Sequence, residues 1–207
     1  MFELSKVEHV HIREAMVGHL RHIEEDLALR VATGLGMEKM PNAPTPAAPI
    51  QEMLPSPPLQ LIGKMKNILI GRCVGILVAD GSDGEVVKKI YKAVIAAGAT
   101  VKIVAPKIGG VQLVDGSMLV ADGQLAGTPS VFFDAVAVIL SDGGAKILTS
   151  EGAAIDFVRD AFGHLKAIAF DKGGQKLLEA ANIGQDEGVV NVNNIDEFIV
   201  AAKTRQW

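Results

Sequence analysis

The segment RCVGILVADGSDGEVVKKIYKAVIAAGATVKIVAP, residues 72–106, decides the fold of this chain. It begins with an apolar run at 72–79, of the kind that forms a buried strand. A helix-like stretch follows at 85–98, and a second apolar run completes the segment at 100–106. Two buried strands joined by a helix form a β-α-β unit with both faces of its sheet covered. The segment therefore predicts a parallel α/β sheet.

The same alternation of apolar runs and helix-like stretches continues toward the C-terminus. Further apolar runs, each followed by a helix-like stretch, lie at 135–140, 166–171 and 189–192. Residues 111–123 predict a hairpin, with its turn at Asp115 and Gly116. We therefore expect residues 67–207 to form a flavodoxin-like, doubly wound parallel sheet with helices on both faces.

Two segments of different character precede this domain. Residues 41–66 hold most of the nine prolines, and such a segment acts as a semi-stiff, extended linker. Within residues 1–40, the stretch 9–31 predicts one helix, which Gly34 and Gly36 end. One face of that helix carries an apolar stripe made of Ile12, Met16, Leu20, Ile23, Leu27 and Val31. We expect this tail to have no core of its own, so the stripe needs a partner surface.

Composition narrows the classes of function. The net charge is −4 and the sequence has no basic run, so it does not predict a surface that binds nucleic acid. No apolar stretch reaches the roughly 18 residues needed to span a bilayer. A single cysteine excludes an intramolecular disulfide and a cysteine-based zinc site. The N-terminus lacks the pattern of a signal peptide, so we expect a cytoplasmic location, with the alternative that a missing N-terminal part carries a secretion signal.

Three loops follow the predicted strands at the sheet edge where α/β proteins bind ligands. In the loop 79–85, glycines precede a helix N-terminus, where a phosphate or a flavin could bind. The carboxylates of this loop would repel phosphate, and Ser82 with Glu85 fits a capping box that explains the loop structurally. The loop 141–145 offers the main-chain N–H groups of half an oxyanion site, or simply a strand-to-helix turn.

The third loop, 171–174, has the shape of a nucleophile elbow, because a strand, one residue, glycines and a helix follow one another. Asp171 occupies the place of the nucleophile, ahead of Gly173 and Gly174. The nearest histidine in sequence, His164, precedes the strand and would lie about 15–20 Å away at its other end. We therefore predict no catalytic residue here, a degenerate elbow, and an N-cap role for Asp171.

The remaining reactive side chains also favour structural roles. Cys73 begins the first strand, away from the ligand-binding edge, and is expected to be buried and inert. His11 and His22 share a helix face but would lie about 16 Å apart. His19 and His22 are neighbours without a third ligand, so we predict no metal site.

Several phrases of the sequence resemble heme catalases. FELSKVE at 2–8, IREAMVGHL at 12–20, IEEDLA at 23–28 and RVATGLG at 30–36 resemble the last helix of the catalase core. The stretch 71–110 resembles the extra C-terminal domain of large-subunit catalases. The resemblance implies that residues 1–40 close the catalase core and that the chain is the end of a longer protein. It also implies a parent enzyme that decomposes hydrogen peroxide with heme, bound in a barrel domain that this chain lacks. The one tyrosine here, Tyr91, lies in a predicted helix of the domain, so no heme-binding residue is carried over.

The extra catalase domain is itself similar to the class I glutamine amidotransferase-like superfamily, which includes PfpI-type proteases and stress chaperones. The resemblance implies a cysteine at the elbow of those relatives, where this sequence has Asp171. It also implies a glutamate early in the first helix, where this sequence has Val86, with Glu85 one position away. Both departures argue against hydrolase chemistry.

We therefore expect a non-catalytic domain, without a cofactor of its own, that stabilises a catalase tetramer and shapes access to its heme channel. Its partners would be the catalase core and neighbouring subunits. In isolation, the exposed stripe would hold unfolding client proteins, as a chaperone does, or join two copies in a homodimer. Two alternatives remain open: a residual hydrolase or glyoxalase-like enzyme at the sheet edge, and a module that binds a flavin or another small ligand.

Overall fold

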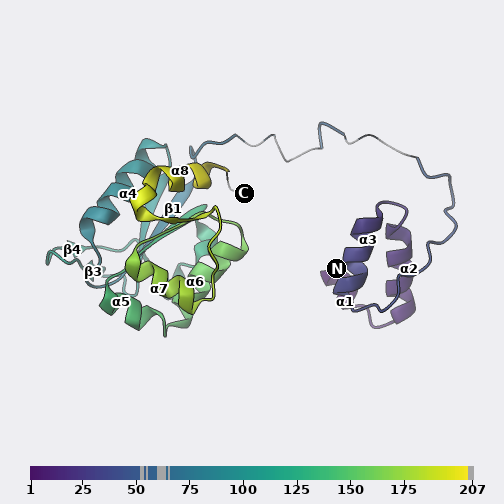
Figure 1. Cartoon of the computed structure of the whole chain (residues 1–207), viewed down its shortest axis with the longest axis horizontal. Coiled ribbons are helices and arrows are strands. Elements are labelled where there is room, and N and C mark those ends of the chain that lie inside the picture. The colour runs from purple at the N-terminus through teal and green to yellow at the C-terminus, as the bar shows by residue number, and fades with distance from the viewer. Residues whose placement is uncertain (52–53, 55, 60–63, 65, 205–207) are drawn as a thin grey trace. The chain divides into compact units, whose positions relative to one another are not determined.

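The computed structural model describes residues 1–51, 54, 56–59, 64 and 66–204. The chain divides into two compact units, Met1–Gly63 and Lys64–Trp207, and the boundary falls inside the proline-rich segment (Figure 1). Among the described helices, none has both the length and the apolar character that crossing a membrane requires.

The described part of the first unit contains three helices, α1 (Phe2–Ser5), α2 (Val10–Leu20) and α3 (Glu25–Gly34). Helices α2 and α3 pack against each other around a small core of Val17, Ala28, Val31 and Ala32. The prediction of one helix over 9–31 is therefore wrong, and so is the prediction that this tail lacks a core.

The break between α2 and α3 has a local cause. The carboxylate of Glu24 accepts hydrogen bonds from the main-chain N–H groups of Asp26, at 3.2 Å, and Leu27, at 2.9 Å, and so caps α3. The guanidinium of Arg21 donates to the carbonyl oxygen of Pro41 at 2.8 Å, which fixes the turn to the chain that follows α3. A glutamate is an unusual cap, so the sequence carries no ordinary signal for a helix start here.

The second unit is built on a six-stranded sheet in the order β5-β2-β1-β6-β7-β8, in which every neighbouring pair is parallel. The strands are β1 (Cys73–Val78), β2 (Thr100–Ala105), β5 (Gly123–Gln124), β6 (Ala135–Ile139), β7 (Ile168–Phe170) and β8 (Val189–Asn191). Without the two-residue edge strand β5, the order is that of the flavodoxin-like fold. The predicted fold class is therefore confirmed.

Helices cover both faces of the sheet (Figure 1). On one face, α4 (Gly84–Ala96) and α8 (Ile195–Thr204) bury Ile90 and Phe198 against alternate residues of β1, such as Ile76. On the other face, Phe157 and Leu177 belong to the second core cluster. The helices of that face are α5 (Asp142–Leu148), α6 (Gly152–Gly163) and α7 (Lys172–Ala180).

A separate antiparallel hairpin joins β3 (Val111–Gln112) to β4 (Met118–Leu119). Its turn contains Asp115 and Gly116, and Gly116 takes a positive φ of 85°. The predicted hairpin and its turn are confirmed. The end of the predicted hairpin segment instead leaves it as β5, which extends the main sheet beside β2. Short 3-10 turns at Leu125–Gly127, Ser130–Phe132 and Val192–Asn194 complete the described connections.

Candidate functional site

The loops after β1, β6 and β7 lie at the carboxyl edge of the sheet, the edge where doubly wound sheets bind ligands. A cleft of about 420 Å³ opens at this edge. Its charged and amide side chains come from four loops, and they are Asp83, Asp142, Asp171, Lys172, Gln175, Asn191 and Asn193. All three ligand-binding loops predicted from the sequence are therefore near one another.

The loop between β1 and α4 is capped by Asp83. Its carboxylate accepts from the main-chain N–H groups of Glu85, at 2.9 Å, and Val86, at 3.3 Å. Ser82 is fully buried, and its hydroxyl lies 2.6 Å from the carbonyl oxygen of Ile139 at the end of β6. The predicted capping box of Ser82 and Glu85 is therefore wrong, because the serine turns inward to a neighbouring strand.

A second serine joins two of the loops directly. The Ser141 hydroxyl donates to the carbonyl oxygen of Asp80 at 2.6 Å and accepts from the N–H of Gly144 at 2.9 Å, which caps α5. A Cβ atom on Gly144 would lie 2.7 Å from that of Ala79. The loops after β1 and β6 thus touch at the point where the strand order reverses, which is the usual place of a ligand crevice.

Asp171 follows β7 and caps α7, as predicted. One carboxylate oxygen accepts from the N–H of Gly174 at 2.7 Å, and both oxygens lie 3.1 Å from the N–H nitrogen of Leu140. Burial raises the pKa of Asp171, while the N–H groups of Gly174, Leu140 and Gly173 act to lower it. The carboxylate therefore joins the start of α7 to the end of β6.

The main chain at Asp171 is extended, with φ −96° and ψ −174°, and carries none of the strain of a nucleophile elbow. The glycines that suggested an elbow have a packing role instead. A Cβ atom on Gly173 would lie 1.9 Å from the Leu140 carbonyl oxygen, and one on Gly174 would lie 2.3 Å from that of Val138. Only glycine lets α7 approach β6 this closely.

The described lining of the cleft holds the carboxylates of Asp83, Asp142 and Asp171 and the amine of Lys172. It contains no histidine, cysteine or serine. His164 ends α6 and precedes β7, whereas Asp171 follows that strand. Asp142 pairs with Lys176 at 2.8 Å, and this hydrogen bond, followed by the charges of Lys176 and Lys172, lowers the pKa of Asp142. The arrangement offers charge and hydrogen bonding, and the absence of a catalytic residue stays a prediction.

Cys73 lies at the amino end of β1, at the edge away from the cleft, as predicted. It is half-buried rather than buried, because it lines a pocket of about 300 Å³ together with Phe132 and Phe133. The prediction of a buried thiol is therefore wrong. The apolar sequence of β1 did not indicate that its first residue would be partly exposed to solvent.

The tail histidines are spread over the first unit. The ring of His22 lies 2.6 Å from the carbonyl oxygen of Pro44, and the rings of His9 and His11 stand 5.6 Å apart. Within the described part of the chain, no three His, Cys, Asp or Glu side chains are grouped to hold a metal ion. The absence of a metal site in the whole chain stays a prediction.

The turn between α2 and α3 divides the predicted apolar stripe. Leu20 packs against the small core of the first unit, where Val31 is buried. Exposed side chains remain at Ile12, Met16, Ile23 and Leu27, and Ile23 is the most open of them at 72%. Most of the predicted stripe thus lies on the surface of the first unit.

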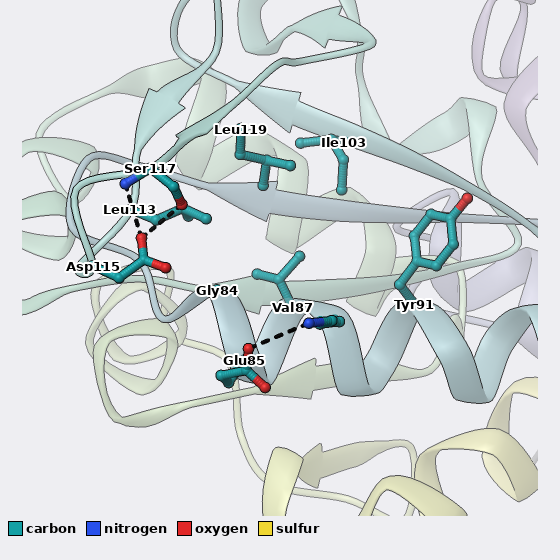
Figure 2. Close-up of a pocket in the computed structure, with 10 residues that line it drawn as sticks. Gly84, Glu85, Val87, Tyr91, Ile103, Leu113, Asp115, Ser117 and Leu119 are labelled. Atoms are coloured by element: carbon teal, nitrogen blue, oxygen red, sulfur yellow. Dashed lines mark hydrogen bonds and ion pairs between the residues drawn. The ribbon is translucent and has the colours of Figure 1, made fainter.

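Sequence reasoning missed a groove of about 340 Å³ between α4, β2 and the hairpin (Figure 2). Leu113 and Leu119 of the hairpin face Val87 and Ile103 across it, and Tyr91 lies at one end. A Cβ atom on Gly84 would come within 2.8 Å of Leu113, so the glycine makes room for the hairpin. The apolar residues at alternate positions of the hairpin were the available signal.

Comparisons with known proteins connect this structure to one group of proteins. The family of C-terminal domains found in long catalases matches residues 70–205, nearly all of the second unit. Catalase C of Rhizobium meliloti (strain 1021) is 40% identical over 93% of this chain and 28% of its own length. Catalase HPII of Pseudomonas aeruginosa is 35% identical over 91% of this chain and 26% of its own length.

A eukaryotic relative shows the same pattern. Catalase-B of Dictyostelium discoideum is 31% identical over 100% of this chain and 31% of its own length. The match therefore includes the helical first unit as well as the α/β unit. The chain spans less than a third of the length of each of these three relatives.

Proposed function

The chain belongs to the family of C-terminal domains found in long catalases, and we propose that it is a non-catalytic domain that stabilises a longer, peroxide-decomposing catalase. One observation carries the non-catalytic part of this proposal. At the one turn with the sequence of a nucleophile elbow, the Asp171 carboxylate is occupied by the N–H groups of Leu140 and Gly174. A group that already accepts these bonds in a relaxed main chain serves the fold.

Heme chemistry is assigned in this proposal to the remainder of the longer protein. The side chain here that could correspond to a tyrosine ligand, Tyr91, lies on α4 and lines the groove under the hairpin (Figure 2). Tyr91 is 46% exposed, and the groove is also lined by the charged side chains of Glu85, Lys88 and Asp115, so these residues do not fit a heme, which needs an enclosed and mostly apolar pocket. The domain would act on peroxide decomposition indirectly, by holding subunits together and narrowing access to the heme channel.

A graft into a relative tests this role. This chain would replace the matching C-terminal part of Catalase C of Rhizobium meliloti, with which it shares 40% identity. The control is the same catalase cut before the part that matches residues 64–207. We expect the graft to keep the assembled state and heat-resistant activity, and the cut protein to lose both. Equal assembly and heat resistance in the graft and the cut protein would refute the stabilising role.

We also propose that the isolated chain binds unfolding client proteins through its first unit. The support is the exposed set of Ile12, Met16, Ile23 and Leu27, since clustered apolar side chains on a surface mark interaction sites. Clients that expose their own apolar core on heating would bury it against these residues. The same exposed set could join two copies of the chain in a homodimer.

Light scattering from a heat-unfolding client enzyme, with and without the chain, measures this activity. We expect suppression at near-equimolar chain, and loss of suppression in the double variant Met16→Ser, Ile23→Ser. The matched control is Val10→Ser, Leu29→Ser, which removes two exposed apolar groups of α2 and α3 that lie outside this set. Equal protection by the two double variants would exclude the exposed set as the client surface.

A residual hydrolase or glyoxalase-like activity remains the alternative enzyme hypothesis. Asp171→Asn should abolish any such activity that depends on the carboxylate, and an unchanged rate would remove Asp171 from it. A flavin-binding module would give a yellow protein after purification. The direct contact between the loops at Ser141 and Asp80 weighs against a flavin at the strand ends.

A further inference from the structure

The outer edge of the β3–β4 hairpin has main-chain groups that point away from the hairpin. Gln112 pairs with Met118, yet its own N–H donates to the Asp80 carboxylate at 2.9 Å and its carbonyl accepts from Gly81 at 2.7 Å. These bonds leave β3 on the side opposite β4, so Gln112 and Met118 form a non-hydrogen-bonded pair. The N–H and C=O groups of Met118 therefore face outward, and by alternation so do those of Val120.

This outward edge is open and unprotected. Within the described ranges, no hydrogen bond reaches the outward main-chain groups of Met118 or Val120. Their side chains are 64% and 70% exposed. Proteins usually guard a free strand edge with a charged residue or a proline, but the stretch 117–121 reads SMLVA and contains neither.

Both faces of the hairpin carry apolar side chains. Its inner face places Leu113 and Leu119 in the groove against α4 (Figure 2), while Met118 and Val120 lie on its outer face. Figure 1 shows the hairpin at the side of the second unit, apart from the six-stranded sheet. A two-stranded ribbon is marginal by itself, and further strands would stabilise it.

We propose that this edge pairs with the same edge of a second copy of the chain. In an antiparallel pairing about a two-fold axis at Leu119, Met118 of one copy faces Val120 of the other. Such a pair exchanges two main-chain hydrogen bonds, and the two-fold axis repeats them. Every outward group of Met118 and Val120 in both copies then has a partner, within a four-stranded ribbon.

A second copy fits this edge better than an unrelated peptide does. The register satisfies all of the open groups with the same four residues, two from each copy. The paired stretch 117–121 is uncharged, so two identical edges meet without repulsion between like charges. Met118 and Val120 also meet as apolar cross-strand neighbours, which buries side chains that are open in the single chain.

Sedimentation velocity of the whole chain over a wide concentration range tests the pairing. Two variants should weaken the pairing between the copies by different means. Val120→Pro removes an outward N–H that the hairpin itself does not use, and proline is tolerated on such an edge. Met118→Lys brings two positive charges close to the axis. The control, Val200→Lys, places the same charge on α8 at a valine that is 61% exposed.

We expect a concentration-dependent dimer that both hairpin variants weaken by about tenfold or more, while the control leaves it unchanged. Circular dichroism of each variant checks that the fold is retained. If Val120→Pro does not fold, the comparison of Met118→Lys with its control tests the pairing. A chain that stays monomeric at every concentration overturns the proposal. So does a dimer that persists in both hairpin variants or is lost only in Met16→Ser, Ile23→Ser.

A cross-linking experiment places the two copies. With Cys73→Ser as background, Met118→Cys should be joined between copies by a short bismaleimide, whereas Val131→Cys, an equally open site, should not. Equal cross-linking at both sites would count against the hairpin as the interface. The sedimentation and cross-linking measurements need neither heme nor peroxide. Their outcome is therefore independent of whether the domain stabilises a catalase.

Discussion

At the turn between β7 and α7, the carboxylate of Asp171 accepts hydrogen bonds from both sides of the turn. Gly174 lies at the start of the helix, and Leu140 lies at the end of the neighbouring strand β6. A cap is ordinarily a local device of one helix. This cap also joins two elements that are about thirty residues apart in the sequence.

Replacing Asp171 by alanine should therefore cost stability. The N–H groups of Gly174 and Leu140 would lose their acceptor in a partly buried place, so we expect a loss of about 1–3 kcal/mol at neutral pH. Urea denaturation measures this change. Asp142→Ala is the control, because its solvent-exposed pair with Lys176 contributes little to stability. Equal losses in the two variants would contradict the bridging role.

The same two carboxyl groups should respond to pH with opposite signs. Burial raises the pKa of Asp171 above its ordinary 3.8, so the folded chain holds that proton more tightly than the unfolded chain. The stability from Asp171 is then fully present below pH 3.8 and falls as the pH rises through the raised pKa. The hydrogen bond from Lys176 lowers the pKa of Asp142, whose stability is present above pH 3.8 and falls as the pH drops.

Denaturation of the wild type and both alanine variants from about pH 3 to about pH 7 tests these signs. The difference between the wild type and Asp171→Ala should shrink as the pH rises. The difference between the wild type and Asp142→Ala should grow over the same range. A shared sign would show that burial does not dominate at Asp171.

Single residues were predictable from the sequence where a local rule decides their role. Asp171 stands between a strand and a helix, and the rule for helix caps identified it. The same kind of rule failed at Ser82, because two candidate caps adjoin and only the packing of β6 decides which one turns inward. Contacts distant in sequence, such as the one to Ile139, leave no local signal.

At the scale of elements, the first turn of α7 lies very close to the end of β6. Gly173 and Gly174 bring the first turn of the helix onto the carbonyl groups of Leu140 and Val138. The sequence suggested that these glycines serve a reactive turn. In the structure they serve the packing of a helix on a strand.

Gly173→Ala should disrupt this packing strongly. Its new Cβ atom would lie 1.9 Å from the Leu140 carbonyl oxygen, and neither main chain can yield easily, so we expect a loss of about 3 kcal/mol or more. Gly163→Ala is the control, since no atom lies within 4 Å of its new Cβ, at the end of α6. That control should change stability by less than about 1 kcal/mol. Thermal unfolding of both variants would reject the packing role if their melting temperatures agreed.

The elements of the second unit were predictable because buried parallel strands are continuous apolar runs, which β1 and β6 show plainly. The turn between α2 and α3 was not, since the stretch around Arg21 and Glu24 contains no glycine or proline and keeps the helical spacing of apolar residues. The strand β5 was missed for a related reason. Two residues are too few to show a period, and only their pairing with β2 defines them.

At the scale of the whole molecule, each unit has its own buried core. The first is a small cluster around Val17 and Val31, and the second consists of two clusters on the two faces of the sheet. Residues 64–207 should therefore fold without the first unit. The boundary between the units lies within the segment predicted as a linker from its prolines.

A chain reduced to residues 64–207 should unfold at nearly the temperature of the α/β unit in the whole chain. It should also lose the protection of client proteins, because the exposed residues around Met16 and Ile23 are absent. Differential scanning calorimetry and the light-scattering assay measure the two properties. If the shortened chain still protects client proteins, the client surface lies in the second unit. A large drop in its melting temperature would show that the second unit does not fold independently.

The bond network of Asp171 bears on how such a domain changes over evolutionary time. A mutation to cysteine would introduce a thiol, but it would also remove the acceptor that Gly174 and Leu140 share. The mutant would lose stability, and the described lining of the cleft contains no histidine that could act as its general base. A cysteine at this turn would therefore need a compensating stabilising change elsewhere in the fold before it could serve as a nucleophile.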